Sequence, residues 1–129
     1  MNTEYDFFGE PISTYTRADA LRDGVLVDVT EQAKQTGFKI PVAITSRVAE
    51  IVEPPEERTG QSWEGRLHDL LSMLFFRIRQ APDTSDLIFF KCAFTTKNCG
   101  RPRPMRFKCA MGPGDTPKPV LTIMLWGED

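Results

Sequence analysis

Three cysteines and one histidine are the side chains in this sequence that most often bind metals or act as nucleophiles. A structural zinc site needs paired Cys or His ligands at short spacing, and the spacing of Cys92, Cys99 and Cys109 does not provide them. We expect Cys92 and Cys109 to be small buried hydrophobic residues. Cys99 could be a reactive thiol because its neighbours are positively charged. The sequence therefore predicts no metal site and no bound cofactor.

Two further motifs could do chemistry but lack the residues that would complete a site. His68 has Glu64 and Ser72 at helical spacing, so acid–base catalysis is conceivable, but no nucleophile motif accompanies it. We interpret His68 as a solvated or capping residue. The Gly-rich segment 112–115 could present N–H groups to an anion. It lacks the Lys-Ser/Thr ending and the following helix of a P-loop, so we interpret it as a hairpin turn.

A basic segment near the C-terminus is the strongest candidate for a binding surface. Residues 1–64 carry twelve acidic and six basic side chains, whereas residues 65–129 carry ten basic and six acidic ones. No carboxylate falls between Leu87 and Gly114. Cations in such a row could bind phosphates, although a solvated face that discourages edge pairing is the alternative. The predicted partner-binding residues are Lys91, Lys97, Arg101, Arg103, Arg106 and Lys108.

The order of elements near the N-terminus suggests a second, enzymatic interpretation. Residues 15–26 read as a strand, a short helix, a glycine and a strand. This order is similar to the opening of ADP-ribosyltransferase folds, which implies that Tyr15 or Arg17 would contact NAD and that Glu128 would orient the ribose. The Ser-Thr-Ser triplet of those enzymes is missing. We therefore expect Tyr15, Arg17 and Glu128 to be structural and keep the NAD-binding enzyme as an alternative.

Capping residues and glycines indicate where four helices begin and end. Thr16 would cap a helix over residues 17–22, and Thr30 and Gly37 would bound a second one. Thr45 or Ser46 would cap a third helix that ends at residue 51. Ser62 would cap the longest helix, from Trp63 to about Gln80. Its apolar stripe consists of Trp63, Leu67, Leu70, Leu71, Leu74 and Ile78.

The last third of the chain reads as three strands, over residues 87–96, 105–111 and 120–126. A hairpin folded about Gly100 and Arg101 would put Phe90, Cys92 and Phe94 on one face and leave Lys91, Arg106 and Lys108 on the other. A slip of one residue would destroy this separation of apolar from charged side chains. In this register the apolar pairs are Phe90 with Met111, Cys92 with Cys109, and Phe94 with Phe107. Only Phe89 would join the charged face, which is few rings for base stacking.

The fold class predicted from these elements is α+β. We expect short N-terminal β/α elements, one long central helix, and a C-terminal three-stranded antiparallel meander packed on that helix. Residues 1–129 suit one domain, with a loosely held arm at 1–10 and an exposed loop at 53–61. No apolar run approaches the roughly 20 residues of a membrane span, and residues 1–11 do not resemble a secretory signal. We therefore expect a cytoplasmic protein without a membrane partner.

Several blocks of the sequence resemble a family of unknown function. They are residues 15–29, 37–45, 112–115 and 119–129. Members of this family are small proteins encoded by bacterial phages, plasmids and integrating elements, so the resemblance implies a mobile-element accessory protein. We expect a non-enzymatic binding protein that inhibits or modulates a host nucleic-acid-processing or defence complex. The alternatives are the ADP-ribosyltransferase-like enzyme and a nucleic-acid-binding protein that uses the basic hairpin 91–108. The sequence does not predict an oligomeric state.

Overall fold

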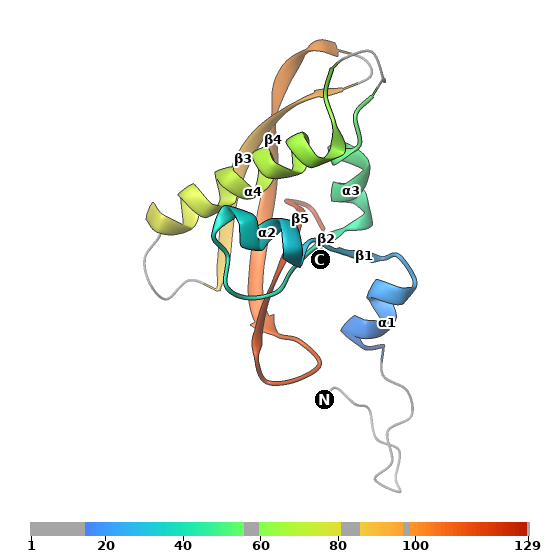
Figure 1. Ribbon diagram of the computed structural model, residues 1–129, viewed down its shortest axis with the longest axis vertical. Coiled ribbons are helices and arrows are strands. Elements are labelled where there is room, and N and C mark those ends of the chain that lie inside the picture. The colour runs from blue at the N-terminus through green and yellow to red at the C-terminus, as the bar shows by residue number, and fades with distance from the viewer. Residues whose placement is uncertain (1–14, 56–59, 81–85, 97–98, 129) are drawn as a thin grey trace, which may run out of the picture.

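The computed structural model describes residues 15–55, 60–80, 86–96 and 99–128, with the side chains of residues 99 and 100 excepted. Figure 1 shows the arrangement of the elements. In chain order they are α1 (Arg17–Arg22), β1 (Leu26–Asp28), α2 (Thr30–Thr36), β2 (Val42–Thr45), α3 (Ser46–Val52), α4 (Trp63–Gln80), β3 (Leu87–Thr96), β4 (Cys99–Pro113) and β5 (Pro119–Leu125). The predicted arm 1–10 lies outside the described residues, as does part of the predicted loop 53–61.

The predicted helices are present, and most of their caps are confirmed. The Thr16 hydroxyl accepts a hydrogen bond from the Asp19 N–H while the Asp19 carboxylate accepts one from the Thr16 N–H, which is a capping box. Thr45 and Ser62 also accept backbone hydrogen bonds from the first turns of α3 and α4. The cap predicted at Thr30 is wrong. Thr30 is the first helical residue of α2, because Asp28 accepts hydrogen bonds from its N–H and its hydroxyl.

One five-stranded mixed sheet, in the order β1-β2-β5-β4-β3, organises the chain. β5 pairs antiparallel with β4 and parallel with β2, and β1 joins the far side of β2. The predicted three-stranded antiparallel meander is therefore wrong, although the α+β class holds. The continuous apolar run Val42–Ile44 of β2 is buried on both faces, and such a run is typical of an internal strand. Burial of this run explains why β5 pairs with β2.

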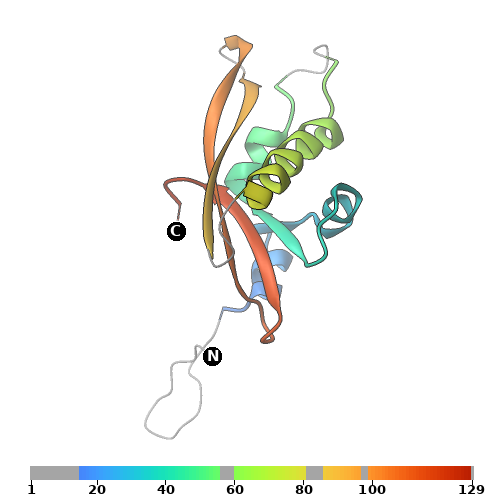
Figure 2. The ribbon, with the colours of Figure 1, turned by 90° about the vertical axis from the view of Figure 1, so that its left-hand side faces the viewer.

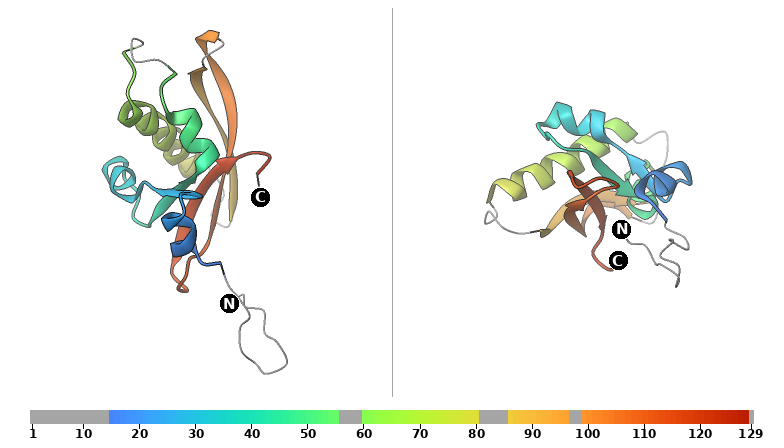
Figure 3. Two further views of the ribbon diagram at one scale, coloured as in Figure 1. Left: turned by 90° about the vertical axis from the view of Figure 1, so that its right-hand side faces the viewer. Right: turned by 90° about the horizontal axis from the view of Figure 1, so that it is seen from below.

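Helices α2, α3 and α4 cover one face of the sheet, as Figures 2 and 3 show. The prediction of one central helix is therefore also wrong: α4 is the longest helix, but it shares this face with the other two. Buried leucines of α4, valines of α3 and Ala33 of α2 meet the inward-facing residues of the sheet in one core. In the described part of the chain, the opposite face of β3 and β4 has no helix over it (Figure 2).

The predicted hairpin register is wrong by four residues. Phe90 lies opposite Phe107, and Cys92 lies opposite Met105. Phe90, Cys92 and Phe94 are buried as predicted, because a slip by an even number leaves every side chain on its face. Met111, predicted to face the core, is 40% exposed. β4 also begins at Cys99 instead of Met105, so most of the predicted turn 97–104 is strand.

Pro104 does not interrupt the pairing of β3 with β4. The Arg106 carbonyl accepts a hydrogen bond from the Trp126 N–H at 3.3 Å, so the backbone groups of Arg106 point away from β3. Pro104, two residues earlier, has the same orientation by the alternation of an antiparallel ladder. Its missing N–H is therefore on the side of β4 that β3 does not use.

Candidate functional site

Exposed charged and aromatic side chains gather on the open face of β3 and β4. Lys91 lies directly opposite Arg106, and Phe89 lies directly opposite Lys108. The side chains of directly paired residues share a face of the sheet, so all four lie on the side away from the helices. The buried residues Phe90 and Phe107 between them fix this orientation from the core side.

Trp126, just after β5, completes this surface. Its ring lies 5.5 Å from the Phe89 ring, centroid to centroid, with an angle of 61° between the planes. The Arg106 guanidinium lies 4.2 Å from the centroid of the Trp126 ring, a cation–π geometry. Phe89 and Trp126 are 42% and 43% exposed. We call Phe89, Lys91, Arg106, Lys108 and Trp126 together the aromatic–cationic surface.

A small apolar hollow of about 120 Å³ lies within this surface. Its lining consists of Phe89, Phe90, Lys91, Arg106, Phe107 and Trp126. Residues from β3, β4 and the turn after β5 therefore meet at one place, although they are far apart in the sequence. An aromatic or other flat apolar group is the kind of ligand that such a hollow can contact.

The charge on this surface has no carboxylate partner among the described residues. Across the described ranges, no Asp or Glu oxygen lies within 4.0 Å of the charged nitrogens of Lys91, Arg106 or Lys108; the salt bridges present are on α1 and α2. Like charges directly opposite each other across a ladder are destabilising. Lys91 and Arg106 are such a pair of like charges.

The structure separates the six cations predicted to bind a partner. Lys91, Arg106 and Lys108 come together on the open face. Arg103 pairs with the buried Phe94 and so lies on the helix side of the hairpin, where it remains exposed. Arg101 is exposed near the tip of the hairpin, and Lys97 lies outside the described residues.

Tyr15, Arg17 and Glu128 have different neighbours. The Tyr15 hydroxyl donates to Asp23 at 2.9 Å. Arg17 donates to the Thr122 hydroxyl at 2.7 Å and to the Leu121 carbonyl at 3.0 Å, and its partial burial lowers the pKa of its guanidinium. A Glu128 carboxylate oxygen accepts hydrogen bonds from the Thr45 hydroxyl and the Leu125 N–H, both at 2.8 Å. The Tyr15 bond stays within the α1 region, whereas the bonds of Arg17 and Glu128 fasten α1 and the C-terminal turn to the sheet. None of these bonds joins one of the three residues to another.

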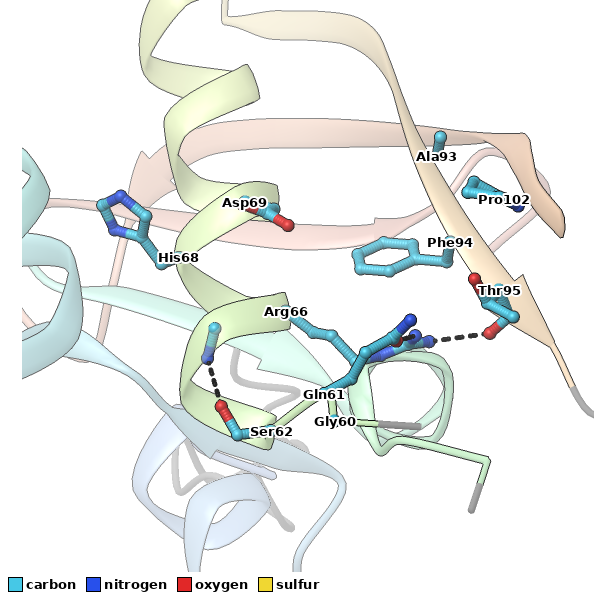
Figure 4. A pocket seen from close by; sticks show the side chains of 11 residues that line it. Gly60, Gln61, Ser62, Arg66, His68, Asp69, Ala93, Phe94, Thr95 and Pro102 are labelled. Atoms are coloured by element: carbon cyan, nitrogen blue, oxygen red, sulfur yellow. Dashed lines mark hydrogen bonds between the residues drawn. The ribbon is translucent and has the colours of Figure 1, made fainter. Parts of the chain in front are cut away.

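Arg66 is the one charged residue of the described chain that is buried, at 5% exposure. Figure 4 shows its guanidinium between α4 and the end of β3. It donates to the carbonyls of Ile51 (2.7 Å), Val52 (2.8 Å) and Thr95 (3.1 Å), and to the side-chain oxygen of Gln61. Its burial lowers the pKa of the guanidinium.

Two open hollows, of about 410 and 520 Å³, lie on either side of Arg66. They would be candidate anion sites if the guanidinium were free to bind a ligand. Its three hydrogen bonds to the ends of α3 and β3 and its bond to Gln61 together use four of its five N–H groups. Its carbon Cζ lies 4.8 Å from the centroid of the Phe94 ring. We therefore interpret Arg66 as a clamp that holds α3, α4 and β3 together.

The remaining candidate residues form no catalytic arrangement. His68 is exposed, with its Nε2 atom 3.3 Å from the Ser72 hydroxyl oxygen. Cys92 and Cys109 are buried and free, and burial raises the pKa of these thiols to about 11 and about 12. Within the described residues, no three His, Cys, Asp or Glu side chains lie close enough together to hold a metal ion. In that same part of the chain, no helix combines the length and apolar character needed to span a bilayer.

Trp126 is the functional candidate that sequence reasoning missed. The sequence shows a strand ending in Leu125-Trp126 but does not show which strand lies beside Arg106. That neighbour follows from the β4–β5 register, which places Phe107 opposite Leu125 and so brings the next residue beside Arg106. The alternation of β5 is a usable signal, since Ile123 and Leu125 face the core and residue 126 then faces outward.

Comparison with known proteins gives a family but no activity. A family model described as a family of unknown function (DUF6573) matches residues 1–129. The chain therefore belongs to this family. No curated protein and no solved structure matches the chain.

Proposed function

We propose that this member of the DUF6573 family is a non-enzymatic binding protein whose partner is a single-stranded nucleic acid. The observation that carries the proposal is the pair Lys91–Arg106, which lies beside the exposed rings of Phe89 and Trp126 and has no neutralising carboxylate among the described residues. Single-stranded nucleic acids are bound by this combination, with cations along the backbone and aromatic rings beneath the bases.

The three cations supply the affinity for phosphate. Lys91, Arg106 and Lys108 can each neutralise one phosphate and release its condensed counterion. For single strands the slope of log K against log salt is about −0.7 per phosphate, so a slope of about −2 is expected. Because Lys and Arg contact phosphates without reading bases, this part of the binding should depend little on sequence.

The two rings supply the preference for single strands. A duplex hides the faces of its bases, whereas a single strand can place them on Phe89 and Trp126. Removing one stacking ring costs about 1–3 kcal/mol of binding free energy. Both rings line the apolar hollow of about 120 Å³, and we expect a base to lie against them there.

The geometry favours binding over NAD chemistry. Tyr15, Arg17 and Glu128 make separate structural hydrogen bonds, and no contact among them supports a nucleotide site. The sequence resemblance supports a further proposal, that the protein comes from a bacterial phage, plasmid or integrating element and acts in the cytoplasm. A host nucleic-acid-processing or defence complex would then encounter it on the nucleic acid that both bind.

Fluorescence anisotropy with a labelled oligo(dT) of about 20 nucleotides tests the proposal, since sites for single strands span about 4–16 nucleotides. We expect saturable binding that weakens with salt, and weaker binding to a duplex of equal length. Trp126→Ala should weaken binding by about 5- to 150-fold, which corresponds to 1–3 kcal/mol. The control Phe76→Ala removes a still more exposed ring on α4 and should leave affinity unchanged. Equal affinity of wild type and Trp126→Ala would refute the proposal.

A further inference from the structure

The edges of the sheet differ in how readily they could pair with a further β-strand. β1, at one edge, is three residues long, and a short edge strand offers little for another chain to pair with. β4 extends beyond β5, whose pairing begins at Phe107, and this unpaired margin carries Pro102 and Pro104, which lack an N–H. β3, at the other edge, is ten residues long, contains no proline, and keeps one register from Leu87 to Phe94.

Three residues of β3 direct their backbone groups outward from this edge. The Asp86 carbonyl accepts a hydrogen bond from the Met111 N–H at 2.8 Å. Hydrogen-bonded and non-hydrogen-bonded pairs alternate along an antiparallel ladder. The N–H and C=O groups of Phe89, Lys91 and Ala93 therefore point away from β4. In the part of the chain that the structure describes, they make no backbone hydrogen bond to another segment, although the Ala93 N–H also contacts the neighbouring Cys92 thiol.

Exposed apolar side chains lie along this edge, both on the sheet and on helix α4. Leu87 and Phe89 of β3 are exposed on the sheet layer. On the helix layer Met73 is 43% exposed. It lies two turns after Arg66, on the side of α4 from which the guanidinium reaches Thr95 of β3. An edge with free backbone groups and apolar flanks is the surface that a further β-strand covers.

We propose that β3 pairs antiparallel with β3 of a second copy of this chain, so that two five-stranded sheets become one continuous sheet. The outward groups lie on odd-numbered residues, so hydrogen-bonded pairs must join odd residues to odd residues. The register that fits sets Phe89 of each copy opposite Lys91 of the partner subunit. This pairing puts each ammonium beside an aromatic ring and keeps the two lysines from facing each other.

A second copy fits this edge better than an unrelated peptide because the edge is self-complementary. In the same register the inward-facing Phe90 would meet the partner's Phe90 across the two-fold axis, so each copy covers the same apolar residue of the other. The inference does not depend on nucleic-acid binding, although the pairing would bring two aromatic–cationic surfaces together on one face.

The molar mass in solution tests the pairing. Light scattering during size-exclusion chromatography measures this mass at protein concentrations from about 5 to 500 μM. Because mass action favours association as concentration rises, the molar mass should approach twice the 14.6 kDa of one chain. Ala93→Pro removes one outward N–H and leaves the β3–β4 hydrogen bonds intact, so it should remain at 14.6 kDa. The control Ala93→Thr keeps the N–H and should dimerise as the wild type does.

Hydrogen exchange of the wild type gives the same test without a variant that could misfold. The amides of Phe89, Lys91 and Ala93 should exchange more slowly as concentration rises, with the change confined to outward-facing amides of β3. A mass of 14.6 kDa at every concentration, together with unprotected amides at these three residues, would overturn the proposal. A dimer that Ala93→Pro leaves intact while keeping its circular dichroism spectrum would also overturn it.

Discussion

The Arg106 guanidinium lies 4.2 Å from the centroid of the Trp126 ring, and across the ladder Arg106 faces Lys91. The same side chain therefore belongs both to an aromatic contact and to a repulsive pair of cations. The ring contact holds the guanidinium above the open face of the sheet, where water and anions can reach it. A phosphate between Lys91 and Arg106 would remove the repulsion and leave the ring contact in place.

Neutralising Lys91 should therefore change stability and affinity in opposite directions. Lys91→Gln removes a like charge opposite Arg106, so the free energy of unfolding should rise by about 0.2–1 kcal/mol. Affinity for oligo(dT) should fall, and its salt slope should become shallower by about 0.7. Urea unfolding and anisotropy titrations measure the two effects. Lys39→Gln removes an exposed charge before β2 and should change neither quantity.

Replacing Arg66 should destabilise the fold more than any exposed substitution on α4. Arg66→Met leaves the carbonyls of α3 and β3 without their donor, and leaving buried acceptors unsatisfied costs about 1–3 kcal/mol each. We expect a loss of about 3 kcal/mol in urea unfolding. Arg79→Met, at an exposed position of the same helix, should stay within about 0.5 kcal/mol of wild type. A loss below about 1 kcal/mol for Arg66→Met would show that the clamp is unimportant.

Engineered disulfides distinguish the observed hairpin register from the predicted one. Lys91 and Arg106 form a non-hydrogen-bonded pair, for which the Cα–Cα distance is about 4.5 Å, within the range that a disulfide bridges. The double variant Lys91→Cys/Arg106→Cys should form this disulfide under mild oxidation, mapped by peptide mass spectrometry. Lys91→Cys/Ala110→Cys, which the predicted register would join, should not, since Ala110 lies opposite Leu87.

The buried thiols should resist alkylation until the chain unfolds. At pH 8 a thiol with the pKa of about 11 of Cys92 carries about 100-fold less thiolate than one at the ordinary value of 9.0. Iodoacetamide should therefore label Cys92 and Cys109 in urea but not in buffer, as peptide mass spectrometry can show. Stoichiometric labelling of both residues in the folded protein would contradict their burial.

The same pKa values give a direction for stability against pH. The folded-state values lie above the unfolded one, so the folded protein holds protons that the unfolded chain loses. The contribution of Cys92 to stability is therefore complete below pH 9 and is lost as pH rises from about 9 to about 11. Cys92→Ala should make unfolding less dependent on pH in this interval.

Local sequence signals predicted the helices and β3 well. The starts of α1 and α4 follow directly from Thr16 and Ser62, because caps act within a few residues. The bounds of β3 were predicted from its run of apolar residues. The faces of the hairpin were also predictable. The register was not, since a shift of four residues buries the same side chains of β3.

Long-range pairing explains what could not be predicted. The parallel pairing of β2 with β5 joins Ala43 to Thr122 across most of the chain, and no turn or local pattern encodes it. Arg66 reads as an exposed helical arginine, because the carbonyls that bury it belong to α3 and β3. Trp126 belongs to the candidate site because the β4–β5 register places it beside Arg106, and the sequence does not reveal that register.

The emission of Trp126 on addition of a single-stranded oligonucleotide tests the central claim most directly. The chain has two tryptophans, so Trp63→Phe leaves Trp126 as the sole reporter. Bases stacked on its ring should quench it saturably with oligo(dT), whereas heparin, which carries charge without bases, should not. An oligonucleotide that binds without changing this emission, or that does not bind at all, would contradict the account.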